Sequence, residues 1–214
     1  GLQAFFMGAD FEYTDAIHGI TSSSALIGCI IGSAVSGFFA SGLGRKNSLF
    51  LAGILFFLSA LGSYYPEFLF FEHGVPSYSL LVAFNFYRVL GGIGVGLASA
   101  ICPMYIAEIA PSNIRGTLVS WNQFAIIFGQ LVVYFVNFLI LGSHANPVID
   151  LVNGVNQIMN PEAAAWTTET GWRLMFVSEA VPAGLFALLV LLVPETPRYL
   201  AMCGKDERAL NVLS

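Results

Sequence analysis

The sequence predicts an all-α membrane protein with five complete transmembrane helices. Hydrophobic residues make up 57% of the 214 residues and charged residues only 10%, whereas about a quarter of the residues in a soluble domain are charged. The mean hydropathy is +0.77. The apolar residues form long continuous runs rather than the alternating pattern of a β-barrel, and runs of about twenty such residues cross a bilayer as helices.

The first two predicted spans cover residues 16–40 and 48–65, with a basic loop between them that contains Arg45 and Lys46. Small residues recur every four positions along the first span, which places them on one helix face. Such a face lets two helices approach closely, and we favour packing over ligand contact as its role. These residues are Ser24, Gly28, Gly32 and Ser36.

The third predicted span, residues 80–105, contains one charge, Arg88. A guanidinium at membrane depth costs at least about 2.5 kcal/mol, so Arg88 should face a protein interior or a watery cavity and have an acidic partner. A structural ion pair between two helices is the alternative role. Gly92 and Gly96 in the same span form a G-x-x-x-G packing motif rather than a nucleotide-binding loop.

The fourth predicted span, residues 117–141, carries Gln123, Gln130 and Asn137 at intervals of seven residues. This interval is two helical turns, so the three amides lie on one face. Amides are costly in lipid, and the stripe should therefore face a cavity or another helix. Binding of a polyhydroxylated ligand explains three amides better than interhelical hydrogen bonding alone, although both readings remain open.

The last predicted span, residues 172–193, follows a loop over residues 142–171 and contains one ionisable residue away from its ends, Glu179. Arg88 and Glu179 are the two charges in the interiors of the spans, and both descend from the outer surface, so we expect them to share a polar pocket. Residues 194–214 read as a short amphipathic helix at a membrane surface.

The basic residues predict the orientation of the chain in the membrane. Six of them fall at one side and only Arg173 at the other, which makes the first side cytoplasmic. No cluster of histidines, cysteines or catalytic side chains has the spacing of a metal site or of an active site, so we expect neither a metal nor an enzyme, and no nucleic-acid binding. The six basic residues are Arg45, Lys46, Arg115, Arg198, Lys205 and Arg208.

Three motifs at the predicted cytoplasmic ends of the spans carry a family resemblance. In chain order they are Gly37-x-x-x-Ser41-x-x-Gly44-Arg45-Lys46, Glu108 to Arg115-Gly116, and Pro194-Glu195-Thr196-Pro197-Arg198, and the segments SALIGCIIG, GGIGVGLAS, PMYIAE and NQFAIIFGQ add to the likeness. With these motifs the sequence resembles the sugar porter family of the major facilitator superfamily, and within it the bacterial D-xylose–proton symporters. Ser41 stands where the family usually has Asp or Asn.

The resemblance implies a carrier of two six-helix halves that exposes its sugar alternately to each side of the membrane. Residues 1–193 then form a partial N-terminal half, helices 2 to 6, and residues 194–214 begin the cytoplasmic linker. The partners would be a monosaccharide, the lipid bilayer, and the missing helix 1 and C-terminal half of the same carrier. The implied function is xylose–proton symport in a bacterial inner membrane; a proton-independent facilitator and a membrane sugar sensor are the alternatives.

The sequence, together with the resemblance, predicts roles for particular residues. The prediction of sugar contact rests first on Gln123, with Gln130 and Asn137 as supporting members of the same stripe. Arg88 and Glu179, with an acid that the family places on helix 1, would couple transport to the proton, which is the coupling ion; no cofactor is expected. A cytoplasmic charge network would hold the inner helix ends together in the outward-facing state, and its members are Arg45, Glu108, Arg115, Glu195 and Arg198.

Overall fold

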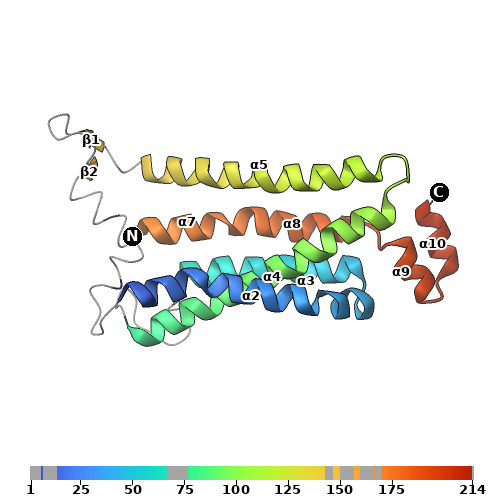
Figure 1. The fold of residues 1–214 in the computed structure, drawn as a ribbon, viewed down its shortest axis with the longest axis horizontal. Helices are drawn as coiled ribbons and strands as arrows, with labels where there is room; N and C mark the ends of the chain where they lie inside the picture. Colours follow the sequence, from blue (N-terminus) through green and yellow to red (C-terminus); the bar gives the residue numbers. More distant parts are fainter. Residues whose placement is uncertain are drawn as a thin grey trace.

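A computed structural model describes residues 6, 14–66, 77–142, 147–149, 157–159, 166 and 170–213. Its long helices run side by side along one axis (Figure 1). They are α2 (Asp15–Gly42), α3 (Arg45–Tyr64), α4 (Tyr78–Ile109), α5 (Arg115–Gly142), α7 (Trp172–Ser178) and α8 (Ala180–Leu192). The shorter elements are α9 (Pro197–Met202), α10 (Asp206–Leu213), and the antiparallel strands β1 (Pro147–Ile149) and β2 (Gln157–Met159).

Five helical segments of the described chain are long and apolar enough to cross a membrane, with α7 and α8 together forming the last. They confirm the predicted spans, and each segment contains most of the corresponding predicted range. The ends that carry the basic residues of α3, α5 and α9 all lie toward the end of the molecule that holds α9 and α10 (Figure 1). This placement agrees with the predicted sidedness of the loops.

A turn interrupts the helix of the last span, a detail that the sequence did not predict. A turn at Glu179 separates α7 from α8. Pro182 has no backbone N–H, so the carbonyl of Ser178 loses the donor that a regular helix would supply. Glu179 N–H instead donates to the carbonyl of Phe176, 3.2 Å away and only three residues earlier. The interruption therefore falls at Glu179, the one acidic residue of this span.

Helix α4 is the central element, and α2 and α3 both pack on it. Its contact with α2 is a backbone contact between glycines. A Cβ atom built on Gly28 would meet the carbonyl oxygen of Val89, and one built on Gly92 would meet the carbonyl oxygen of Ala25. One turn further along, the next glycines of α2 and α4 approach the facing backbone just as closely. The predicted small-residue face of α2 and the G-x-x-x-G motif of α4 are thus confirmed as one close helix contact.

Two apolar clusters lie on either side of this contact. The outer cluster joins Leu80, Phe84 and Trp172, with Phe176 packed against it. The inner cluster centres on Ala52, Leu97, Ile101 and Val190, so it links α3, α4 and α8. The clusters fix α3 and the α7–α8 span against the α2–α4 pair.

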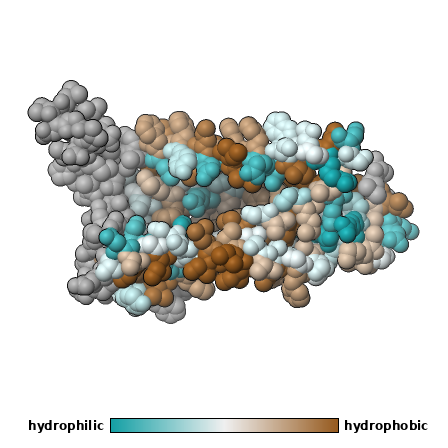
Figure 2. Space-filling model, in the orientation of Figure 1, coloured by the Kyte–Doolittle hydropathy of each residue, from teal (hydrophilic) through white to brown (hydrophobic). Residues whose placement is uncertain are grey.

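Helix α5 stands apart from the other spans. None of the residues in the most apolar stretch of α5 is buried, whereas 39% of the residues in the corresponding stretch of α3 are buried. It touches the described part of the bundle through α4 and α7. In the space-filling view a hollow runs beside α5, and hydrophilic residues border it (Figure 2). Gln123 and Gln130 of the predicted amide stripe are exposed on this helix.

The connecting segments differ from the prediction in two places. The loop over residues 142–171 contains the β1–β2 hairpin, which its composition did not indicate. The segment after the last span is two short helices rather than one. They are separated by a turn at Gly204, whose positive φ of 68° few other residues adopt.

We predict that Gly92→Ala destabilises the protein and that Gly129→Ala does not. Both changes add one methyl group to a helix interior and gain the same helix propensity. At Gly92 the methyl group meets the α2 backbone, whereas at Gly129 no heavy atom lies within 4 Å. Overpacking of this kind costs about 1–3 kcal/mol. Thermal unfolding of the full-length protein in detergent measures the difference, and equal melting temperatures would refute the backbone contact.

Candidate transport site

Arg88 and Glu179 lie at one cavity, as the sequence predicted. The cavity has a volume of about 370 Å³, and both Arg88 of α4 and Glu179, at the α7–α8 break, line it. Ser59 of α3 adds a hydroxyl group to the wall, and Gly91 and Gly92 leave the wall open on the α4 side. The helix interruption at Glu179 thus lies beside this cavity, whose wall is mostly apolar apart from Arg88, Glu179 and Ser59.

Arg88 does not use Glu179 as an ion-pair partner. Among the described residues no ion pair joins the two side chains. The guanidinium carbon of Arg88 instead lies 5.2 Å from the centre of the Phe176 ring, over its face. An arginine so placed interacts with the ring quadrupole. The alternative role for Arg88, a structural ion pair between two helices, has no counterpart in this arrangement.

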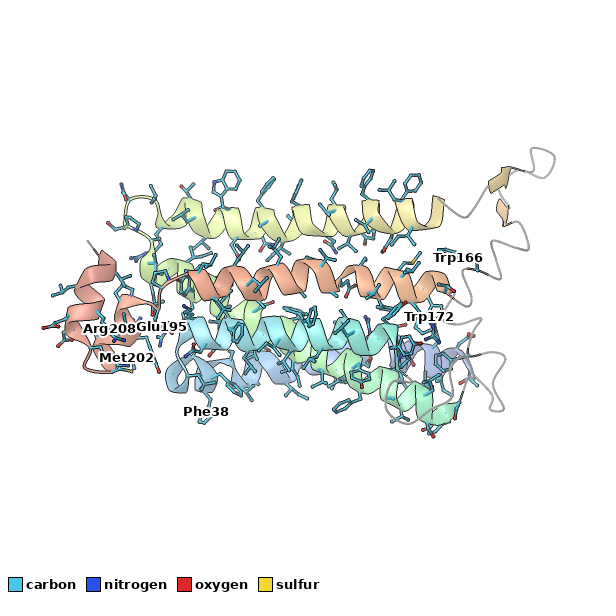
Figure 3. All side chains as sticks on the ribbon, turned by 180° about the vertical axis from the view of Figure 1, so that it is seen from behind. Phe38, Trp166, Trp172, Glu195, Met202 and Arg208 are labelled. Atoms are coloured by element: carbon cyan, nitrogen blue, oxygen red, sulfur yellow. The ribbon has the colours of Figure 1, made fainter. Side chains whose placement is uncertain are left out.

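A cluster of charges lies at the α9 end of the bundle, opposite the end that holds Trp172 (Figure 3). Arg45 and Glu108 form an ion pair of 2.8 Å, with only 8% and 7% of their side chains exposed. Arg45 also donates to the carbonyl of Ala40 at 3.1 Å. Arg198 reaches the same Glu108 oxygen at 3.9 Å from an exposed position. The pair joins the start of α3 to the end of α4.

Glu195 belongs to this cluster in a way that the sequence did not reveal. Its carboxylate accepts hydrogen bonds from the backbone N–H groups of Arg45 and Lys46, each at 3.1 Å, and of Thr196 at 3.0 Å. It therefore caps the N-terminus of α3 from outside the helix. Gly44, with φ of 93°, has no side chain to cap the helix itself, and a Cβ atom there would meet Glu195 and the Tyr199 ring.

Arg115 lies outside this cluster, which corrects the predicted network of five residues. Its side chain is exposed and donates to the carbonyl of Ala110 at 3.4 Å. It therefore contacts the end of α4 rather than an acidic side chain. The remaining four residues of the predicted network, which meet around the start of α3, are Arg45, Glu108, Glu195 and Arg198.

The amide stripe lies on α5, away from the walls of the Arg88 cavity. Gln123 and Gln130 are exposed, and Asn137 is partly buried. The side-chain oxygen of Asn137 is buried without a hydrogen-bond partner in the described chain. A link that the sequence did not predict joins α5 to α4, where Cys102 donates to the side-chain oxygen of Asn122 at 3.3 Å. Within the described chain, the Asn137 side-chain oxygen thus remains available to a further donor.

These features define a class of protein. Several helices of membrane-spanning length, two charges in a cavity among them and a charge cluster at one helix end are typical of polytopic transport proteins. The sequence profile of the sugar (and other) transporter family matches residues 3–214, and the chain belongs to that family.

The chain is similar to known sugar transporters over nearly its whole length. It is 47% identical over 205 residues to the D-xylose-proton symporter of Escherichia coli, covering 93% of this chain and 38% of that protein. It is 33% identical over 199 residues to the glucose facilitated diffusion protein of Zymomonas mobilis, covering 93% of this chain and 37% of that protein. The chain therefore spans well under half the length of these relatives.

A solved structure shares the fold. The xylose transporter XylE from Escherichia coli, in a partially occluded inward-open conformation, matches with a TM-score of 0.83 at 44% identity, over 99% of this chain and 47% of that chain. The described helices thus correspond to part of a major facilitator fold, as the sequence predicted.

We predict that Glu195→Ala lowers stability by about 1–2 kcal/mol, the usual cost of losing a helix N-cap. The change leaves the Arg45 and Lys46 N–H groups without their acceptor. Glu207→Ala is the control, because Glu207 is exposed in the first turn of α10. Thermal unfolding compares the two variants, and equal melting temperatures would show that water replaces the cap at no cost.

Proposed function

We propose that this chain is the N-terminal part of a monosaccharide carrier that couples xylose or a related pentose to the proton in a bacterial inner membrane. Family membership and the identity to a D-xylose-proton symporter support the substrate class. Because the chain spans 38% of that relative, the remaining helices, helix 1 and the C-terminal half, are part of the proposal. The carrier works by alternating access, in which two halves rock about a central sugar.

The observation that carries the proposal is the cavity that holds Arg88 and Glu179 together without an ion pair. Because Arg88 and Glu179 are not bound to each other in this cavity, either side chain can bind a different group when the other is neutralised. Protonation of an acid in the cavity therefore alters the interactions of Arg88. If the two carrier states differ in those interactions, the proton shifts the balance between them.

The sugar-binding surface in the proposal is the amide stripe of α5. Gln123, Gln130 and Asn137 offer both donors and acceptors, which suits a ligand with several hydroxyl groups. The unpartnered oxygen of Asn137 and the hollow beside α5 support a polar occupant (Figure 2). Helix 1 would also have room beside α5, because the most apolar stretch of α5 has no buried residue in the described chain.

The charge cluster at the α9 end of the bundle acts as a state-dependent clamp in this scheme. Its buried ion pair between Arg45 and Glu108 retains hydrogen-bonding capacity, because the Nε of Arg45 and one Glu108 oxygen have no partner among the described residues. Partners from the C-terminal half would complete the clamp when the inner side is closed. Opening would break those bonds while leaving Glu195 on the start of α3.

A proton-independent facilitator is the second candidate, because one relative is a glucose facilitated diffusion protein. Gln123, Gln130 and Asn137 would serve the same role in either carrier. The two candidates differ only in whether Arg88 and Glu179 respond to protons. Variants of that pair therefore discriminate between them.

We predict that Gln123→Ala weakens sugar binding about tenfold or more in the full-length carrier, because a hydroxyl group loses its amide partner in a dry site. Thr117→Val is the control, since it removes a polar group from α5 outside the stripe. Xylose binding by calorimetry measures the effect. Wild-type affinity in the folded Gln123→Ala protein would mean that the stripe serves helix packing.

We predict that Arg88→Leu still exchanges xylose across the membrane but no longer accumulates it against a gradient. The variant keeps the sugar surface on α5 and removes the cation that responds to the proton. Counterflow and proton-driven uptake, measured side by side in vesicles, separate the two activities. Intact accumulation would contradict coupling through Arg88, and loss of folded protein would indicate a structural role.

A further inference from the structure

The Arg88 guanidinium rests on an aromatic ring in a cavity that also contains a carboxylate. Phe176 and Glu179 are three residues apart on the α7 side, so they point in similar directions. Phe84 and Arg88 are four residues apart on α4. The two helices therefore present Phe84 beside Phe176, and Arg88 over the Phe176 ring and toward Glu179.

The Phe176 ring is held from two other sides. Its centre lies 5.4 Å from that of Phe84 at an interplanar angle of 72°, and 6.3 Å from that of Trp172 at 78°. Both are edge-to-face contacts of the favourable kind. Phe84 and Trp172 are themselves buried, with 1% and 4% of their surface exposed. The ring thus meets Arg88 with its orientation already fixed, so little side-chain entropy is lost in the contact.

The ring and the carboxylate are two different partners for one guanidinium. The attraction of the ring does not change with pH, whereas the attraction of Glu179 disappears when its carboxylate takes up a proton. The guanidinium is within the cation–π range of about 6 Å from the ring centre, at 5.2 Å. No ion pair ties it to Glu179 in the described chain. The ring therefore takes the place that a direct carboxylate contact would otherwise fill.

We propose that Phe176 is a positioning residue of proton coupling: its ring holds the Arg88 guanidinium off Glu179, so that Glu179 can be protonated without leaving Arg88 unpartnered. The inference rests on the proposed role of Arg88 and Glu179 as the coupling pair. It adds the residue that keeps this pair from locking into a permanent ion pair.

Few other charged groups of the described chain surround Glu179. Helix α4 contributes Arg88, and the α3 wall of the cavity contributes the hydroxyl of Ser59 but no charge. Arg173, earlier on α7, donates to the carbonyl of Tyr64 at 3.3 Å and lies over the Trp172 ring. Arg173 therefore has other partners. Among the described residues, the charge that most affects Glu179 is Arg88, which can contact either the Phe176 ring or Glu179.

The experiment compares Phe176→Leu, Phe176→Tyr and Phe84→Leu in the full-length carrier. Phe176→Leu keeps an apolar side chain but removes the ring face. Phe176→Tyr keeps the ring. Phe84→Leu removes one of the aromatic contacts between α4 and α7 but leaves Arg88 its ring, so it is the matched control for packing. The readout is the pH profile of xylose counterflow, with proton-driven uptake measured in parallel.

Without the ring, Glu179 becomes the remaining partner of Arg88, and the closer ion pair favours the ionised carboxylate. A more acidic medium is then needed to protonate it. We expect Phe176→Leu to move the midpoint of the counterflow profile about half a pH unit or more toward acid, from the strength of a desolvated cation–π contact. Phe176→Tyr and Phe84→Leu should keep the wild-type midpoint.

An unchanged midpoint in Phe176→Leu, an equal shift in Phe84→Leu, or a wild-type counterflow profile that does not vary with pH would each overturn the inference. Failure of the symport proposal is a separate result. It would appear as wild-type protein that exchanges xylose but does not accumulate it when the outside is acid, and the counterflow profile would still decide the role of Phe176.

Discussion

The backbone contact between α2 and α4 is the constraint on which the other features depend. At Gly28 and Gly92 the two helices meet without room for a single methyl group. Close contact of this kind replaces the hydrophobic driving force that helices lack in lipid. It fixes the position of α4, and α4 carries Arg88 on one side of the contact and Glu108 at its inner end. The cavity beside Arg88 and the charge cluster at the α9 end are thus set by one rigid pair of helices.

The two ends of α4 use their charges in opposite ways. At the inner end, Glu108 and Glu195 bind defined donors at 2.8 to 3.1 Å, so the start of α3 is fastened to α4 and α9. In the cavity, Arg88 has an aromatic partner and Glu179 has no ion pair with it among the described residues. Alternating access needs elements with two arrangements of similar energy. The hydrogen-bonded inner end supplies a contact that can open. In the cavity, Arg88 is a charge that can change partner.

Much of this arrangement was predictable, because it follows from local rules. Span lengths, the small face of α2 and the pocket shared by Arg88 and Glu179 depend on helical periodicity and on the cost of charge in lipid. The cap formed by Glu195 was not predictable, because it depends on α9 folding back onto a helix about 150 residues earlier. The ring under Arg88 was missed for a similar reason: Phe176 is one of 19 phenylalanines, and only the packing of α7 on the bundle distinguishes it.

The central claim is that sugar and proton cross the membrane together through a carrier built on this half. Xylose-induced alkalinisation of a weakly buffered suspension of cells that express the full-length carrier tests it most directly. The account predicts that the external pH rises when xylose is added under anaerobic conditions, and that a proton ionophore abolishes the rise. Entry of labelled xylose with no change in external pH would contradict the account and leave a facilitator built on the same fold.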